Sequence, residues 1–236
     1  MFEFEAACIG QAFCELGPRA RELMRFFGMS MEGLRRRAVR YRVSLRLEAG
    51  QVCWIGGPSG AGKSVLLGAL YAQAPVDERI RVESIALERD RAVIDCVTGP
   101  LSRSLELLSR AGLSDVPCLL RPPAMLSNGQ QWRYRLARAL MSGRQLIFAD
   151  EFCASLDATT AGVAAYQVRR IATASRCIFV LAGCREDVLA ELRPDVLVVL
   201  GGREADVIYQ NSGRNPSRSK EEHSLSIGPI QTEGAV

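Results

Sequence analysis

Gly57-Pro58-Ser59-Gly60-Ala61-Gly62-Lys63-Ser64 fits the phosphate-loop pattern G-x-x-x-x-G-K-[S/T] at every fixed position. Residues 51–55, before this octapeptide, are short, apolar and β-branched at the end, which is typical of a buried strand. Residues 65–72, after it, predict a helix. Strand, glycine-rich loop and helix in this order are the context that a phosphate-binding loop requires.

The glycines of this loop let the backbone curl, so that successive N–H groups face one hollow. A helix that starts near Gly62 adds the positive end of its dipole. We expect Lys63 to reach the β- and γ-phosphates of a nucleoside triphosphate and the Ser64 hydroxyl to ligate Mg²⁺, and the candidate binding set runs on to Val65. A chance glycine-rich turn is the weaker interpretation, because the local context is also right.

Two acids follow a second apolar segment. Residues 146–149 predict a strand buried on both faces, and Asp150 and Glu151 come directly after it. We expect Asp150 to reach the Mg²⁺ held by Ser64, and Glu151 to orient and deprotonate the water that attacks the γ-phosphate. Two solvated acids at an exposed strand end would explain this pair if it stood alone, but not downstream of a phosphate loop.

A further candidate anion site lies at residues 126–130, Leu-Ser-Asn-Gly-Gln, before a helix predicted over residues 128–141. Ser127 is a natural N-cap, and Gly129 and Gln130 belong to the same helix start, where backbone N–H groups are free to bind an anion. Lys63 already serves one phosphate locally. The second site therefore suggests a nucleotide contributed by another subunit, although a capped helix alone remains an alternative.

The order of elements predicts an α/β fold. Strict alternation over residues 39–47 predicts a half-solvated strand in an antiparallel sheet. Further strands are expected at 80–87, 92–97, 146–149, 177–182, 196–200 and 206–209. Helices are expected at 19–27, 101–111, 128–141, 159–175 and 186–191, with a loop at 114–123. Alternating strands and helices favour a mostly parallel sheet flanked by helices, with the ligand at the carboxyl ends of its strands.

The composition is that of a globular protein, with 48% hydrophobic and 24% charged residues in 236 and a formal net charge of +4. The N-terminus carries acids where a signal peptide would carry Lys or Arg, and the apolar runs are too short to cross a bilayer. These features predict a cytoplasmic protein. The eight cysteines form no C-x-x-C pair and have no histidine at ligand spacing, so we expect buried thiols in a reducing compartment and no zinc.

The motifs together resemble those of the ATP-binding-cassette (ABC) ATPases. Residues 126–130 resemble the family's LSGGQ signature, with Asn128 for the first glycine. Asp150-Glu151-Phe152 resembles the Walker B segment, with Phe152 for the usual proline, and residues 155–157 resemble the D-loop. Phe27 falls where the family places an adenine-stacking aromatic.

This resemblance implies a P-loop NTPase with an N-terminal antiparallel β subdomain and a shortened helical subdomain. It implies ATP and Mg²⁺ as ligands, Glu151 and Lys63 as catalytic residues, and hydrolysis of ATP to ADP and phosphate. It also implies a head-to-tail homodimer, with each ATP between residues 57–64 of one subunit and residues 127–130 of the other.

Two positions depart from the family pattern. Cys184 occupies the place of the switch histidine, and a neutral thiol is a weak donor, so hydrolysis is expected to be slow unless Arg185 compensates. The Q-loop glutamine is expected at the end of a strand near residue 95, where the chain has Asp95.

The predicted division is an N-terminal extension over 1–21, an ABC-type domain over 22–210 and a disordered polar tail over 211–236. The resemblance is nearest to soluble prokaryotic ABC-class ATPases related to those fused to a predicted acetyltransferase, although no acetyltransferase segment is present. Three alternatives stay open: the ATP-binding subunit of a membrane transporter with a permease partner, a DNA-associated ATPase suggested by the arginines within 35–46, and a nucleotide switch that scarcely turns over.

Overall fold

The computed structural model describes residues 1–10, 16–30, 39–201 and 204–210. The predicted polar tail at 211–236 and the arginines at 35–37 lie outside the described residues. Among the helices that are described, none is both long and apolar enough to cross a membrane.

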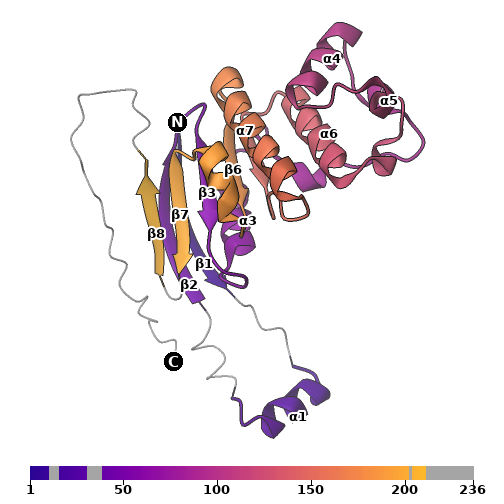
Figure 1. Cartoon of the computed structure of the whole chain (residues 1–236). Coiled ribbons are helices and arrows are strands. Elements are labelled where there is room, and N and C mark those ends of the chain that lie inside the picture. The colour runs from indigo at the N-terminus through magenta and orange to yellow at the C-terminus, as the bar shows by residue number, and fades with distance from the viewer. Residues whose placement is uncertain (11–15, 31–38, 202–203, 211–236) are drawn as a thin grey trace, which may run out of the picture.

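A six-stranded sheet with the order β4-β5-β6-β3-β7-β8 forms the centre of the molecule (Figure 1). Neighbouring strands run parallel except for the antiparallel pair β7–β8. The strands are β3 (Val52–Gly56), β4 (Arg79–Arg81), β5 (Leu146–Ala149), β6 (Ile178–Ala182), β7 (Val196–Gly201) and β8 (Glu204–Tyr209). This arrangement confirms the predicted α/β class with a mostly parallel sheet.

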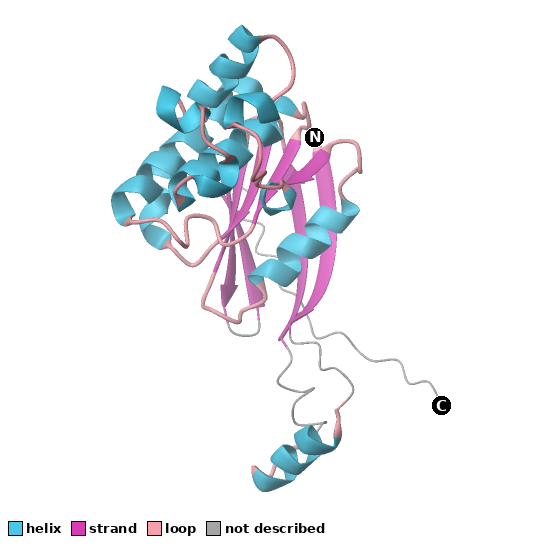
Figure 2. Cartoon of the chain, turned by 90° about the vertical axis from the view of Figure 1, so that its right-hand side faces the viewer, coloured by secondary structure: helices cyan, strands magenta, loops and turns pink. Residues whose placement is uncertain are grey.

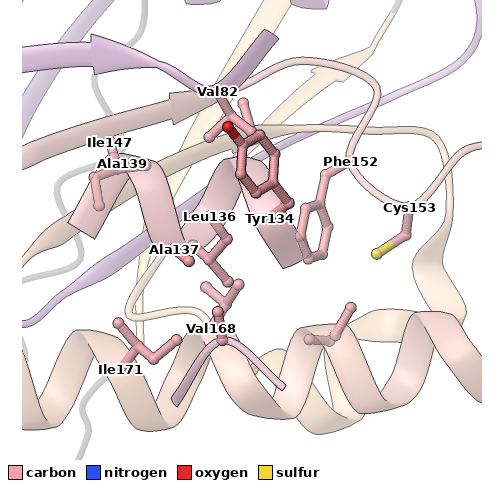
Figure 3. Packing of buried hydrophobic residues seen from close by; sticks show 14 of the residues in the cluster. Val82, Tyr134, Leu136, Ala137, Ala139, Ile147, Phe152, Cys153, Val168 and Ile171 are labelled. Atoms are coloured by element: carbon pink, nitrogen blue, oxygen red, sulfur yellow. The ribbon is translucent and has the colours of Figure 1, made fainter. Parts of the chain in front are cut away.

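The central strands are covered on both faces, because every residue of β3, β5 and β6 is buried. Cys53 and Ile55 of β3 belong to a core cluster with α3 (Lys63–Gln73) and the small N-terminal sheet. Val52 and Trp54, which point to the opposite face, belong to a second cluster with α6 (Asn128–Met141) and α7 (Ala158–Ser175). Figure 3 shows part of this second cluster.

The N-terminal sheet pairs β1 (Phe2–Gly10) with β2 (Val39–Leu47) in antiparallel register. The predicted alternation holds over residues 42–47, with the apolar side chains buried and the polar ones exposed. The amide of Gln73 on α3 accepts a hydrogen bond from Glu5 N (3.1 Å) and donates one to Glu5 O (2.8 Å), which satisfies the edge of β1. Because β1 is part of this sheet, the predicted domain boundary at residue 22 does not fall at a break in the fold.

The helical part of the molecule comprises α4 (Leu101–Arg110), α5 (Val116–Leu119) and α6, which lie together at one side of the sheet (Figures 1 and 2). Helix α4 ends where predicted, since Gly112 takes a φ of +81° that glycine tolerates. The predicted loop at 114–123 instead contains α5, which buries Cys118 and Leu119. The short η4 (Glu186–Val188) and α8 (Leu189–Leu192) follow β6.

The predicted strands at 80–87 and 92–97 are wrong except for β4. Short 3₁₀ turns, η1 (Val82–Ser84) and η2 (Val93–Cys96), replace them, and a third, η3 (Pro123–Met125), precedes α6. The partner of β4 is the four-residue β5, and their pairing ends at Arg81–Phe148. Beyond Arg81 the chain forms turns instead of a strand. These turns bury single apolar residues, such as Val82 and Val93, against the helical part.

Helix α1 (Pro18–Phe26) lies in the connection between β1 and β2 and ends before Gly28, as predicted. Both views place it apart from the remaining helices and strands (Figures 1 and 2). No residue of α1 is buried.

Candidate nucleotide-binding site

The loop between β3 and α3 has the curled backbone that an anion nest needs. Gly57, Gly60 and Gly62 have φ values of +139°, +79° and +94°, a region that glycine enters without steric cost. A Cβ on Gly57 would lie 2.4 Å from the carbonyl oxygen of Leu200, so glycine is also required by space. The octapeptide therefore has the geometry predicted from its sequence.

The start of α3 leaves its backbone donors available. Gly62 is the N-cap and offers no side-chain acceptor to the first turn. Lys63 Nζ donates to the carbonyl oxygens of Gly57 and Pro58, at 2.8 Å each, so the ammonium group lies over the loop. A helix N-terminus and an ammonium group beside one hollow are suited to bind the phosphate chain of a nucleotide.

Ser64 and Asp150 meet across the carboxyl end of the sheet. Ser64 Oγ donates to Asp150 Oδ1 at 3.1 Å, although the two residues are 86 positions apart in the chain. A hydroxyl and a carboxylate oxygen at this separation suit Mg²⁺, which prefers oxygen ligands and takes few of them from the protein. The residues present therefore fit a nucleotide phosphate chain with a magnesium ion.

Glu151 follows directly and has a left-handed backbone, with φ +47°. Its N–H donates to Asp150 Oδ1 at 2.9 Å, and the N–H of Phe152 donates to Ala182 O on β6 at 2.8 Å. These bonds turn the chain sharply where β5 ends, and Glu151, the residue after Asp150, is exposed.

Phe152, which stands where the family usually has proline, packs in the core. It is buried at 2% exposure, with its ring edge-to-face against Trp54 and Trp132 at centroid distances of 6.2 and 5.6 Å. The aromatic side chain thus joins the sheet to α6 at the position where the family has proline.

The acid that the neighbouring strand brings to Asp150 is Glu83, and the strand that was expected to end near Asp95 is absent. Asp95 lies in η2, whereas Glu83 lies two residues after β4 and accepts a hydrogen bond from Asp150 N at 2.9 Å. Loss of water around the Glu83 carboxyl raises its pKa, and the charge of Asp150 acts in the same direction. The sequence analysis missed Glu83 because it extended the strand to residue 87.

A pocket of about 360 Å³ opens beside these acids. Glu83, Asp150 and Glu151 line one wall, and residues of α6 line the other, among them Asn128 and Arg135. The pocket therefore lies between the acid cluster and the helical part of the molecule.

Ser127–Gln130 form the predicted helix start. Ser127 Oγ accepts from Gln130 N (3.4 Å) while Gln130 Oε1 accepts from Ser127 N (3.0 Å), which is a complete capping box. Gly129 packs against α7, where a Cβ would lie 3.2 Å from Thr160 Cγ2. Among the described residues, no hydrogen bond joins 127–130 to the loop at 57–64, and Asn128 lines the same pocket as Asp150.

Arg185, the residue after Cys184, is bonded to other parts of the chain. Its guanidinium donates to the carbonyl oxygens of Cys153 (3.3 Å) and Leu156, and it pairs with Asp187. These bonds commit the side chain to the loop after Glu151, while Cys184 is exposed at the end of β6.

Phe27 is not brought to the phosphate loop. It is the C-cap of α1, is 64% exposed and contacts the ring of Phe26 at a centroid distance of 5.5 Å. Its role in adenine stacking stays a prediction without structural support.

Cys53 and Cys153 have the properties of inert core residues, since burial raises the pKa of each thiol to about 12. Within the described ranges, no group of three or more His, Cys, Asp or Glu side chains is arranged to hold a metal ion.

The comparisons with known proteins agree with this geometry. The family model described as ABC transporter matches residues 41–99. An aliphatic sulfonates import ATP-binding protein of Pseudomonas putida is 37% identical over 164 residues, which are 58% of this chain and 60% of that protein. A phosphonates import ATP-binding protein of Hyphomonas neptunium is 29% identical over 204 residues, covering 69% of this chain and 77% of the relative.

Two solved structures share the fold. The ADP conformation of MJ1267, an ATP-binding cassette of an ABC transporter, gives a TM-score of 0.59 at 18% identity over 72% of this chain and 84% of that one. A dimeric structure of MJ0796, a bacterial ABC transporter cassette, gives 0.56 at 22% identity over 71% and 88%.

The fold and the phosphate-loop geometry define the class of the protein as a P-loop NTPase. Within that class it has the ABC cassette fold, and the relatives to which it is similar are named as ATP-binding proteins for import. The chain spans 60% of the length of the sulfonate-import relative.

Proposed function

We propose that this chain is an ABC-type ATPase that binds ATP with Mg²⁺ at residues 57–65 and Asp150 and hydrolyses it to ADP and phosphate. The observation that carries the proposal is the 3.1 Å contact between Ser64 and Asp150, with Glu151 next in the chain. When bound, Mg²⁺ would neutralise charge on the phosphates. Lys63 would hold the β- and γ-phosphates, and Glu151 would accept the proton of the attacking water.

We further propose that two chains pair head to tail, so that residues 127–130 of one complete the site of the other. Within one chain the capped start of α6 forms no hydrogen bond to the phosphate loop among the described residues, which supports this arrangement. ATP binding would close the pair and hydrolysis would reopen it, which makes ATP a conformational switch.

The test is Glu151→Gln, which removes the proton acceptor and leaves the binding residues in place. We expect the variant to form a dimer in ATP and Mg²⁺ that light scattering after gel filtration detects, and to stay monomeric in ADP. Glu151→Gln combined with Lys63→Ala is the matched control and should remain monomeric. A monomer at saturating ATP and Mg²⁺ would contradict the paired site.

A second candidate is the ATP-binding subunit of a membrane transporter, which is favoured by the names of the importer relatives. The alternative is a soluble ABC-class ATPase that has no permease partner. Co-purification of the Glu151→Gln dimer with an identified permease from native membranes would decide for the transporter. The DNA-associated alternative has less support, since Arg46 pairs with Glu3 at 2.9 Å.

A further inference from the structure

Helix α1 is amphipathic. At 3.6 residues per turn, Ala20, Leu23, Met24 and Phe27 fall on one face and Arg21, Glu22 and Arg25 on the other, with Arg19 and Phe26 at the borders. This division of side chains is the pattern of a helix that covers an apolar surface.

The apolar face of α1 has no cover in the described structure. Leu23, Phe26 and Phe27 are 56%, 85% and 64% exposed, and the two phenyl rings contact each other edge-to-face. A cluster of large apolar side chains in water is unfavourable, so it indicates a binding surface.

The positive charge around this face favours a negatively charged partner. Helix α1 carries a net positive charge, because it has three arginines, Arg19, Arg21 and Arg25, and one acid, Glu22. The sequence has three further arginines at 35–37. Apolar and basic side chains lie next to each other on this exposed helix, so its partner must offer apolar contact and negative charge side by side. A second copy of α1 would bring like charges together, which disfavours self-association.

We propose that α1 binds the surface of an anionic phospholipid bilayer. The helix lies in the interface plane, with Leu23 and Phe27 among the acyl chains and the arginines among the phosphate groups. Helix α1 lies in the connection between β1 and β2, apart from the remaining helices and strands (Figures 1 and 2).

The experiment is flotation of the full chain with phosphatidylcholine vesicles, with and without about one third phosphatidylserine. We expect binding only to the anionic vesicles, and weaker binding as the salt concentration rises. Leu23→Glu combined with Phe27→Glu should lower the partition coefficient about tenfold or more, and Arg21→Gln with Arg25→Gln should do the same. Unchanged circular dichroism of the variants excludes global unfolding.

Val116→Glu with Leu120→Glu is the matched control, because these side chains on and next to α5 are 62% and 67% exposed. This pair should not change flotation. Equal binding to neutral vesicles, no binding to anionic ones, or equal effects of the two glutamate pairs would overturn the proposal. So would a dimer that depends on Phe27 and forms without lipid.

Discussion

Cys184 is the residue at which the site departs most from the family pattern. It is exposed at the end of β6, and its neutral thiol is a poor hydrogen-bond donor to a phosphate oxygen or to water. Because the neighbouring Arg185 is committed to the loop at 153–156, the chain has no replacement at the next position.

We therefore predict that Cys184→His raises the steady-state rate of ATP hydrolysis by about tenfold or more, since a positioned imidazole supplies a strong donor. Phosphate release measured under saturating ATP checks the prediction. Cys184→Ser, which has a similar size without the imidazole, should stay near the wild-type rate. A His variant no faster than the Ser variant would show that this position does not limit hydrolysis.

Arg185 is a positioning residue for the loop that follows Glu151. Glu151 and Cys153, at the start of this segment, are non-glycine residues with left-handed backbones, and such conformations persist only when the surroundings hold them. Arg185 helps to stabilise these conformations, because its guanidinium donates hydrogen bonds to the carbonyl oxygens of Cys153 and Leu156.

Replacement of Arg185 by Gln should lower kcat about tenfold while KM for ATP changes little, because the phosphate loop is untouched. Arg185→Lys should recover part of kcat, since it keeps one charged donor. Equal losses in kcat and in ATP affinity would contradict a role limited to the loop after Glu151.

At the level of elements, the buried carboxylate of Asp195 joins β3, β7 and α7. Its Oδ2 accepts from Val52 N at 2.8 Å and pairs with Arg169 Nη1 at 2.6 Å, and Arg169 also donates to Gly50 O. Asp195 is only 6% exposed, so the ion pair is shielded from water.

Asp195→Ala is expected to lower the free energy of unfolding by about 3–5 kcal/mol, because it leaves the Arg169 charge without its buried partner. Glu106→Ala, which breaks the exposed pair of Arg103 and Glu106, should cost less than about 1 kcal/mol. Urea unfolding of both variants measures the difference. A similar loss of unfolding free energy in Asp195→Ala and Glu106→Ala would contradict the claim that burial makes the Asp195 ion pair more important for stability.

The elements that the sequence predicted well are those whose signals are local. Helix α6 begins at its capping box and spans residues 128–141 as expected, and β5 is followed by its two acids. The segment from 82 to 97 could not be predicted in this way. Its shape depends on the short pairing of β4 with β5 and on contacts with α6, such as the hydrogen bond from Tyr134 to Glu88 at 2.7 Å.

The difference between local signals and long-range contacts also decides which residues of the candidate site the sequence could predict. Gly57–Ser64 and Asp150 could be predicted as candidates because each motif contains its own chemistry, whereas Glu83 reaches Asp150 only through the order of strands in the sheet. Phe27 was assigned from its place in the chain, and the fold places it on a separate helix.

At the scale of the whole molecule, the phosphate loop, the acids after β5 and the start of α6 lie on different elements around one sheet. The first two meet within the chain through Ser64 and Asp150. The third belongs to the helical part and forms no hydrogen bond to the phosphate loop among the described residues, which is why we propose that a second chain completes the site.

The central claim is that residues 57–64 bind the phosphate chain of ATP while Asp150 meets Ser64 at a magnesium ion. Calorimetric titration of ATP, with Mg²⁺ and with EDTA, tests it most directly. We predict that Mg²⁺ strengthens ATP binding by the wild type, that Asp150→Asn loses most of this gain, and that Lys63→Ala weakens binding about tenfold or more in Mg²⁺. ATP affinity that is unchanged in Lys63→Ala, or a Mg²⁺ effect that is unchanged in Asp150→Asn, would contradict the account.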